Sequence, residues 1–186
     1  LTILQPYATL ICGLAANDPR RKRVENRTHS RFANYRGLLL IHAGLSKGLL
    51  WPYTSSWVSY RRENNYGIPH NQLTFGAIVG AVDMVSHFQP GHMSAFIGHF
   101  ELEVNGVVTK SDTQNVVRKI IPASERVMRP WLETHQHVEG PHCLVFENIR
   151  KFREPIPCKG AQGMWNLPAK LEAKVKEALE SAEVLP

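Results

Sequence analysis

Residues 75–88 read FGAIVGAVDMVSHF, a run that strongly indicates a β-strand. Its two glycines, Gly76 and Gly80, indicate a bend or the close approach of another part of the backbone. Upstream, residues 38–43 (LLLIHA) show no polar alternation, which predicts a strand buried on both faces. Two further strands are predicted at 96–104, before the Asn105-Gly106 turn signal, and at 143–152. We expect these four runs to close one small mixed β-barrel with a shared core.

Helical signals are few and lie between or outside the strand-like runs. Residues 7–14 follow Pro6 and place apolar residues at helical spacing, which predicts a short helix after an extended segment at 1–4. Residues 116–121 suit a helix that Pro122 stops, and Ser124 could cap another. An amphipathic helix is predicted from Leu167 to Ala182. This sparse alternation favours an α+β fold over a doubly wound sheet.

The chain has 186 residues, of which 43% are hydrophobic and 20% charged, enough for one sizeable core. We expect one domain over residues 1–168, with an aromatic-rich insertion at 44–74 holding a helix near 54–64, and a second insertion at about 105–140. Residues 169–186 form a helix on the same domain. No apolar run approaches the roughly 20 residues of a membrane span, and no signal peptide is recognised. This predicts a cytoplasmic protein, with the nucleus as the alternative.

Positive charge is concentrated in one part of the chain. Residues 18–36 hold seven Lys or Arg against two acids, which accounts for +5 of the formal net charge of +6. Such clustering attracts polyanions. A solvated basic loop is the alternative interpretation. Within the run, Glu25, Asn26 and Arg27 combine an acceptor, an amide and a fork of donors, which suits recognition of a base edge or a small polar ligand.

Five motifs occur in order along the chain: LQPYA at 4–8, KRVENR at 22–27, YRG at 35–37 leading to LIHA at 40–43, FGAIVG at 75–80, and PIPCKG at 155–160 before Trp165. Together they resemble the ASCH domain (activating signal cointegrator homology), a family of the PUA-like superfamily. The resemblance implies a PUA-like mixed β-barrel with flanking helices and a cleft between them. Family members bind RNA or DNA, and some are ribonucleases or amidohydrolases acting on modified nucleosides.

The resemblance also implies which residues line the cleft. These are Gln5, Tyr7, Lys22, Glu25, Asn26, Arg27, His42, Lys47 and, at the edge, Trp165. Tyr7 stands where the family often has Trp, and Glu25 stands where the amidohydrolase branch has a threonine. Arg20, Arg21 and Arg23 are expected to contact phosphates at the rim, with Glu25 and Arg27 paired in the interior.

The leading hypothesis is a nucleic-acid-binding module that holds RNA, or single-stranded DNA, in this basic cleft. The alternative is a metal-independent hydrolase in which Lys22 or His42 acts as general acid or base with Glu25. A third hypothesis, a protein-interaction adaptor, is supported only by the aromatic insertion and the terminal helix. The sequence does not identify its protein partners. The spacing of His135, His137 and His142 fits no known zinc pattern, and no metal or cofactor is predicted.

Overall fold

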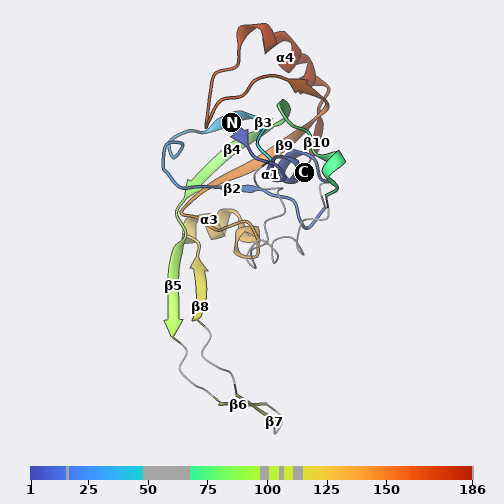
Figure 1. Ribbon diagram of the computed structural model, residues 1–186. Coiled ribbons are helices and arrows are strands. Elements are labelled where there is room, and N and C mark those ends of the chain that lie inside the picture. Colours follow the sequence, from blue (N-terminus) through green and yellow to red (C-terminus); the bar gives the residue numbers. More distant parts are fainter. Residues whose placement is uncertain (16, 48–67, 97–100, 105–106, 111–114, 186) are drawn as a thin grey trace. The chain divides into compact units, whose positions relative to one another are not determined.

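Figure 1 shows the computed structural model of the chain, which describes residues 1–15, 17–47, 68–96, 101–104, 107–110 and 115–185. The predicted helix at 54–64 lies outside these residues. The chain forms two compact units. Unit 1 comprises Leu1–Glu25, Asn34–Ser86 and Val145–Pro186, and unit 2 comprises Asn26–Ala33 and His87–Leu144.

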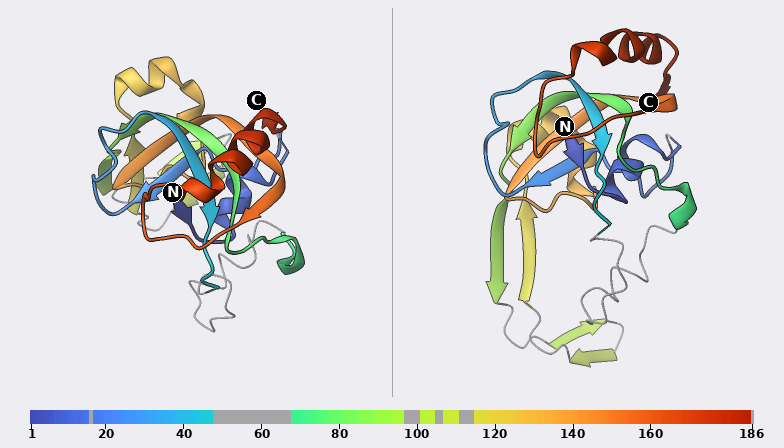
Figure 2. Two further views of the ribbon diagram at one scale, coloured as in Figure 1. Left: turned by 90° about the horizontal axis from the view of Figure 1, so that it is seen from above. Right: turned by 45° about the horizontal axis from the view of Figure 1, so that its top comes forward.

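A six-stranded sheet forms the framework of unit 1. Its strand order is β1 (Thr2–Ile3), β3 (Gly37–Ala43), β4 (Ala77–Phe88), β9 (His142–Pro157) and β10 (Glu183–Leu185), and β2 (Val24–Arg27) also pairs with β9. β1 runs parallel to β3, whereas β3 with β4 and β9 with β10 are antiparallel. Figure 2 shows the long strands β4 and β9 in two further views. The α+β class and the strands predicted at 38–43 and 75–88 are confirmed.

The approach expected at a glycine of β4 occurs at Gly80. A Cβ atom on Gly80 would lie 2.3 Å from the carbonyl oxygen of Arg150 and 2.9 Å from Cys12 Sγ. No side chain larger than hydrogen fits there, so glycine lets helix α1 (Tyr7–Cys12) and strand β9 come close to β4. The predicted short helix is present, but it ends at Cys12 rather than near Leu14; Pro6 is its N-cap residue, and it buries Ala8, Leu10, Ile11 and Cys12.

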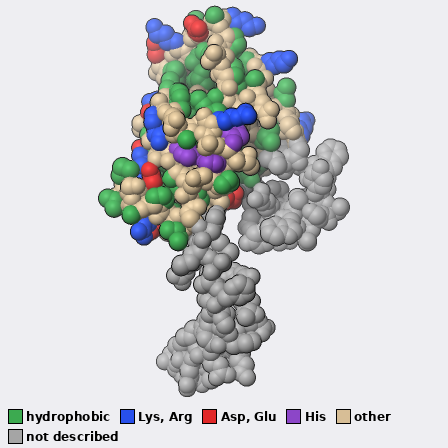
Figure 3. Space-filling view, turned by 90° about the vertical axis from the view of Figure 1, so that its left-hand side faces the viewer, with side chains coloured by type: hydrophobic (Ala, Val, Ile, Leu, Met, Phe, Trp, Pro, Cys, Tyr) green, Lys and Arg blue, Asp and Glu red, His purple; other side chains and the backbone are tan. Residues whose placement is uncertain are grey.

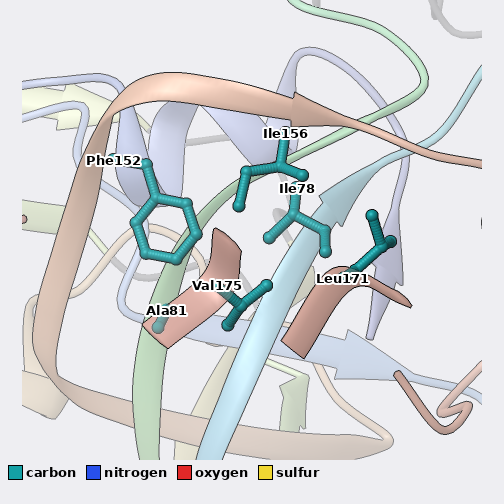
Figure 4. Close-up of a cluster of buried hydrophobic side chains, with 6 residues drawn as sticks. All are labelled: Ile78, Ala81, Phe152, Ile156, Leu171 and Val175. Atoms are coloured by element: carbon teal, nitrogen blue, oxygen red, sulfur yellow. The ribbon is translucent and has the colours of Figure 1, made fainter. Parts of the chain in front are cut away.

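The terminal helix packs on the sheet of unit 1. Figure 4 shows the core cluster that joins them, made by Ile78, Ala81, Phe152, Ile156, Leu171 and Val175. The last two belong to a short 3-10 helix, η3 (Ala169–Leu171), and to α4 (Glu172–Glu180). The α-helix is therefore shorter than predicted: residues 169–171 form η3, and after Glu180 the chain turns into the unpredicted strand β10. Across the described residues, every helix is too short or too polar to cross a membrane.

Unit 2 corrects three sequence-based expectations. The described parts of the run predicted at 96–104 belong to two ladders: β5 (Gly91–Phe96) pairs with β8 (Asn115–Ile120), and β6 (Glu101–Val104) pairs with β7 (Val107–Lys110). These ladders are separate from the six-stranded sheet. Most of the helix expected at 116–121 is instead strand β8, because its β-branched residues favour a strand once β5 supplies backbone hydrogen-bond partners.

Short helices complete both units. In unit 2, α3 (Ala123–Met128) is followed by the 3-10 helix η2 (Pro130–Glu133). Ser124 lies inside α3 and Pro122 is its N-cap residue, so the expected serine cap is wrong. In unit 1, the 3-10 helix η1 (His70–Gln72) precedes β4. The strand expected at 143–152 is confirmed within β9, which extends five residues further, to Pro157.

Candidate functional site

A nearly buried ion pair lies where the chain leaves α1 and enters β2. Lys22 Nζ lies 3.5 Å from Glu25 Oε2, with side-chain exposures of 4% and 10%. The same ammonium lies over the ring of Tyr7, 5.0 Å from its centroid. The backbone amide of Lys22 donates to the carbonyl oxygen of Leu10 at 2.9 Å, which fixes the start of this segment against α1. Three of the predicted cleft residues are thus brought together.

The chemistry of this group differs from that of an exposed pair. Removing two charges from water costs several kcal/mol per ion, so a buried pair adds little net stability. Breaking it by removing one partner is costly, because the remaining charge stays buried. Lys22 offers donors, Glu25 offers acceptors, and the half-buried Tyr7 adds an aromatic face. The group can therefore recognise a polar, planar ligand or transfer a proton.

The side-chain amide of Gln5 is hydrogen-bonded within unit 1. Its side chain is fully buried, its Nε2 donates to the carbonyl oxygen of Thr74 at 2.6 Å, and its Oε1 accepts from the amide of Thr9 at 3.1 Å. The second contact caps the first turn of α1. Gln5 thereby positions Tyr7 and fastens the segment before β4.

His42 and Trp165 form a second group, at the end of β3. His42 is 2% exposed, its Nε2 lies 3.1 Å from the carbonyl oxygen of Cys158, and its ring meets Trp165 edge to face at 5.6 Å. Thr2 Oγ1 accepts from Trp165 Nε1 at 2.9 Å and lies 3.4 Å from His42 Nδ1. Burial lowers the pKa of His42, which favours the neutral imidazole. The geometry is that of a packed histidine with occupied ring nitrogens.

Trp165 also lines a pocket of about 300 Å³ in unit 1. The pocket is also lined by Tyr35, Met164, Asn166 and residues 38–40 of β3. The remaining cleft candidate of unit 1, Lys47, is exposed and lies over the Phe75 ring at 5.6 Å.

Asn26 belongs to unit 2, where its amide joins the turn before β9. Its Nδ2 donates to the carbonyl oxygen of His137 at 2.9 Å, and its Oδ1 accepts from the amides of Glu139 and Gly140, each at 3.1 Å. Cys143 Sγ lies 3.5 Å from the same oxygen. These contacts occupy both ends of the amide, so Asn26 acts here as a structural clamp. Arg27 follows it on β2 and is half-buried.

Two of the three arginines expected at a phosphate-binding rim have partners within the protein. Arg20 forms an ion pair with Asp18, whose pKa its guanidinium lowers to about 2. Arg21 is 5% exposed and donates from Nη2 to the carbonyl oxygen of Leu185 at 2.9 Å. Both arginines therefore have contacts within the protein that the sequence analysis did not anticipate. Sequence separation of 164 residues hides the Arg21 contact from a local interpretation.

Histidines gather on one face of the molecule in Figure 3. In unit 2, His142 stacks on His87 with ring centroids 5.2 Å apart, and His135 meets His137 edge to face at 5.5 Å. Within the described part of the chain, no three His, Cys, Asp or Glu side chains are grouped to hold a metal ion.

Sequence reasoning missed two cations of β9, Lys151 and Arg153, which line a second pocket of unit 1. The signal was present, since residues two apart in a strand share a face.

Comparison with known proteins adds no family: no known protein family matches this chain, and no curated protein is significantly similar to it.

Proposed function

We propose that the chain is an ASCH-type module that binds nucleic acid, either RNA or single-stranded DNA. The observation that carries the proposal is the nearly buried Lys22–Glu25 pair beneath the ring of Tyr7. Single-stranded nucleic acids are recognised through unpaired bases that stack on aromatic rings and hydrogen-bond along their edges. This group supplies an aromatic face, donors and acceptors within a few ångströms of each other.

The arrangement also argues against a purely structural role for the pair. A hydrophobic pair of the same volume would stabilise the fold at least as well, because it carries no desolvation cost. A pre-formed pair does have value in recognition, since its polar atoms are already fixed when a ligand arrives. Glu25 would accept from a base amino group while Lys22 holds the carboxylate in place.

Phosphate attraction in this proposal comes from the cations that remain accessible. Arg36 and Lys47 are exposed in unit 1, and Arg23 is half-buried next to Lys22. Such residues contribute a sequence-independent, salt-sensitive part of the affinity. Gln5 and Asn26 enter as positioning residues, because their amides are bonded within the protein.

A hydrolase is the second candidate, and the same ion pair favours it. Lys22 and Glu25 could serve as general acid and general base on an RNA phosphodiester or on an amide of a modified nucleoside, without a metal ion. His42 fits this role less well, since its Nε2 is bonded to Cys158. Incubating the protein with labelled RNA and acylated nucleosides, with and without a chelator, separates turnover from binding.

The finer fold assignment belongs to the same proposal. We infer that the six-stranded sheet is the wall of a closed PUA-like barrel, and that the protein acts in the cytoplasm or nucleus. A crystal structure with continuous hydrogen bonding around the strands would support closure, and an unpaired edge on the side of β1 that faces away from β3 would refute it.

Tyr7→Ala tests the proposed base stacking. Stacking on an aromatic ring contributes roughly 1 to 3 kcal/mol per base, so the variant should bind short single-stranded RNA and DNA more weakly by that amount. Tyr35→Ala is the matched control, because Tyr35 is also half-buried but lines the other pocket. Fluorescence anisotropy measures both. Equal affinities for the wild type and Tyr7→Ala would refute the proposed stacking.

A further inference from the structure

A pocket of about 350 Å³ in unit 1 is walled by α1, the segment around η1, and the last part of β9. Its charged lining residues are Arg20, Lys151 and Arg153. Acidic side chains are absent from the described residues that line it. A concave site with charge of a single sign attracts counter-ions more strongly than a flat surface, because its walls focus the field.

The local structure explains why two cations face this pocket together. Lys151 and Arg153 are two residues apart on β9, so the alternation of the strand directs both to one face. Phe152, between them, belongs to the core cluster that fastens this part of β9 to β4 and α4. The strand is therefore a rigid support for the two cations.

The charge balance in the pocket is positive after nearby partners are counted. Asp18 balances Arg20, with Arg20 Nε 2.9 Å from Asp18 Oδ1. Lys151 Nζ makes one long contact, 3.4 Å to the carbonyl oxygen of Gly13, which leaves other ammonium hydrogens for a ligand. Glu183 is opposite Lys151 in the β9–β10 register and is exposed. Arg153 is exposed as well.

The floor of the pocket adds no negative charge. Cys12 lies there, and burial raises its pKa to about 12, so the thiol stays protonated at neutral pH. Three residues with uncharged polar side chains, Thr9, Gln72 and Thr74, also line the pocket. Hydroxyl and amide donors of this kind commonly supplement lysine and arginine around phosphate oxygens.

We propose that this pocket binds a phosphate group, with Lys151 and Arg153 as its main donors. The site is distinct from the Lys22–Glu25 group. Thr9 and Cys12 line the pocket, whereas Tyr7 meets Lys22, and at 3.6 residues per turn these positions point to different sides of α1. The proposal does not depend on base recognition, because a free phosphate compound or a nucleic-acid backbone would present the same chemistry.

Two binding measurements test this site. The first is calorimetric titration with inorganic phosphate, a 5′-nucleoside monophosphate and the corresponding nucleoside. The second is fluorescence anisotropy with a single-stranded oligonucleotide. Lys151→Gln/Arg153→Gln should weaken the phosphate-bearing ligands at least tenfold and leave nucleoside binding unchanged. The matched control is Lys170→Gln/Lys174→Gln, which removes two exposed cations outside the pocket and should change affinity less than twofold. The single variant Arg153→Gln, at an exposed position, should show a smaller loss with an unchanged thermal midpoint.

The loss of affinity in Lys151→Gln/Arg153→Gln, compared among these ligands, identifies the source of the phosphate group. A loss confined to the oligonucleotide assigns the pocket to a nucleic-acid backbone, and the slope of log affinity against log salt should then fall by roughly 1.4 for two lost contacts to a single strand. A loss that includes inorganic phosphate or the monophosphate assigns it to small phosphate compounds. Equal losses in the pocket and control variants, or no binding of any phosphate-bearing ligand to the wild type, would overturn the proposal.

Discussion

Gly160 lies so close to the imidazole of His42 that a Cβ atom there would be 2.3 Å from His42 Cε1 and 2.4 Å from Nδ1. The segment after β9 therefore closes directly over the end of β3. Cys158 bonds to the ring from the same segment, and Trp165 meets it edge to face. The PIPCKG motif thus owes its glycine to a packing requirement at His42.

Gly160→Ala should lower the free energy of unfolding by roughly 1 to 3 kcal/mol, as overpacking does in a dense core. The cost should largely disappear in a His42→Ala background, because the obstructing ring is then absent. Chemical denaturation of the four proteins of this cycle measures the coupling. An equal cost in both backgrounds would show that the ring is not the obstacle.

Burial of His42 predicts a pH dependence of stability. Its pKa is lowered in the folded protein by desolvation, from an ordinary value of 6.5. Below that value the unfolded chain binds a proton that the folded protein resists, so stability falls as pH drops. Denaturation at pH 7.5 and pH 5.5 should show this loss in the wild type and a smaller loss in His42→Gln. The same pH dependence in both proteins would exclude His42 as its source.

Asn26→Ala should destabilise unit 2. It deprives the amides of Glu139 and Gly140 and the carbonyl of His137 of their side-chain partner. Each such group costs about 1 to 3 kcal/mol where it stays buried, and less where water reaches it. Hydrogen exchange of the Glu139 and Gly140 amides should accelerate in the variant. Unchanged exchange, with weaker ligand binding, would instead make Asn26 a contact residue.

Neighbouring residues of β4 offer a paired test of the core. Ile78 is fully buried in the cluster of Figure 4, whereas Val79 points to the other face and is half-buried. Ile78→Ala should cost roughly 2 to 5 kcal/mol of unfolding free energy, and Val79→Ala should cost less. Denaturation curves decide the order. A larger cost at Val79 would contradict the assignment of the faces.

Local sequence patterns predicted those elements whose secondary structure is determined by their own residues. The β-rich run of β4, with a glycine at its close contact, and the helix after Pro6 are such cases. β8 and β10 required knowledge of distant partners: β8 is fixed by β5, and Glu183–Leu185 becomes a strand only beside residues 149–151 of β9. Apolar spacing alone does not distinguish a short helix from a strand in such segments.

The sequence indicated which residues to consider for the candidate site, but not how their side chains are arranged. Lys22 and Glu25 lie three residues apart, and their meeting follows from proximity along the chain. The sequence could not show that Arg21 is buried against Leu185 or that Asn26 clamps a turn more than 100 residues away. A charge run reports how many cations are present, whereas folding decides which remain accessible.

The binding affinity of Glu25→Gln for short single-stranded RNA and DNA, measured by fluorescence anisotropy at several salt concentrations, tests the central claim. If Glu25 and Lys22 recognise a base, the variant should bind more weakly, by roughly 1 to 3 kcal/mol, and discriminate less between sequences. Glu125→Gln is the matched control, since Glu125 forms a similarly buried pair with Arg129 at 2.9 Å, and it should leave binding unchanged. Tighter binding by Glu25→Gln that is indifferent to sequence would reduce the segment to a basic surface and contradict the account.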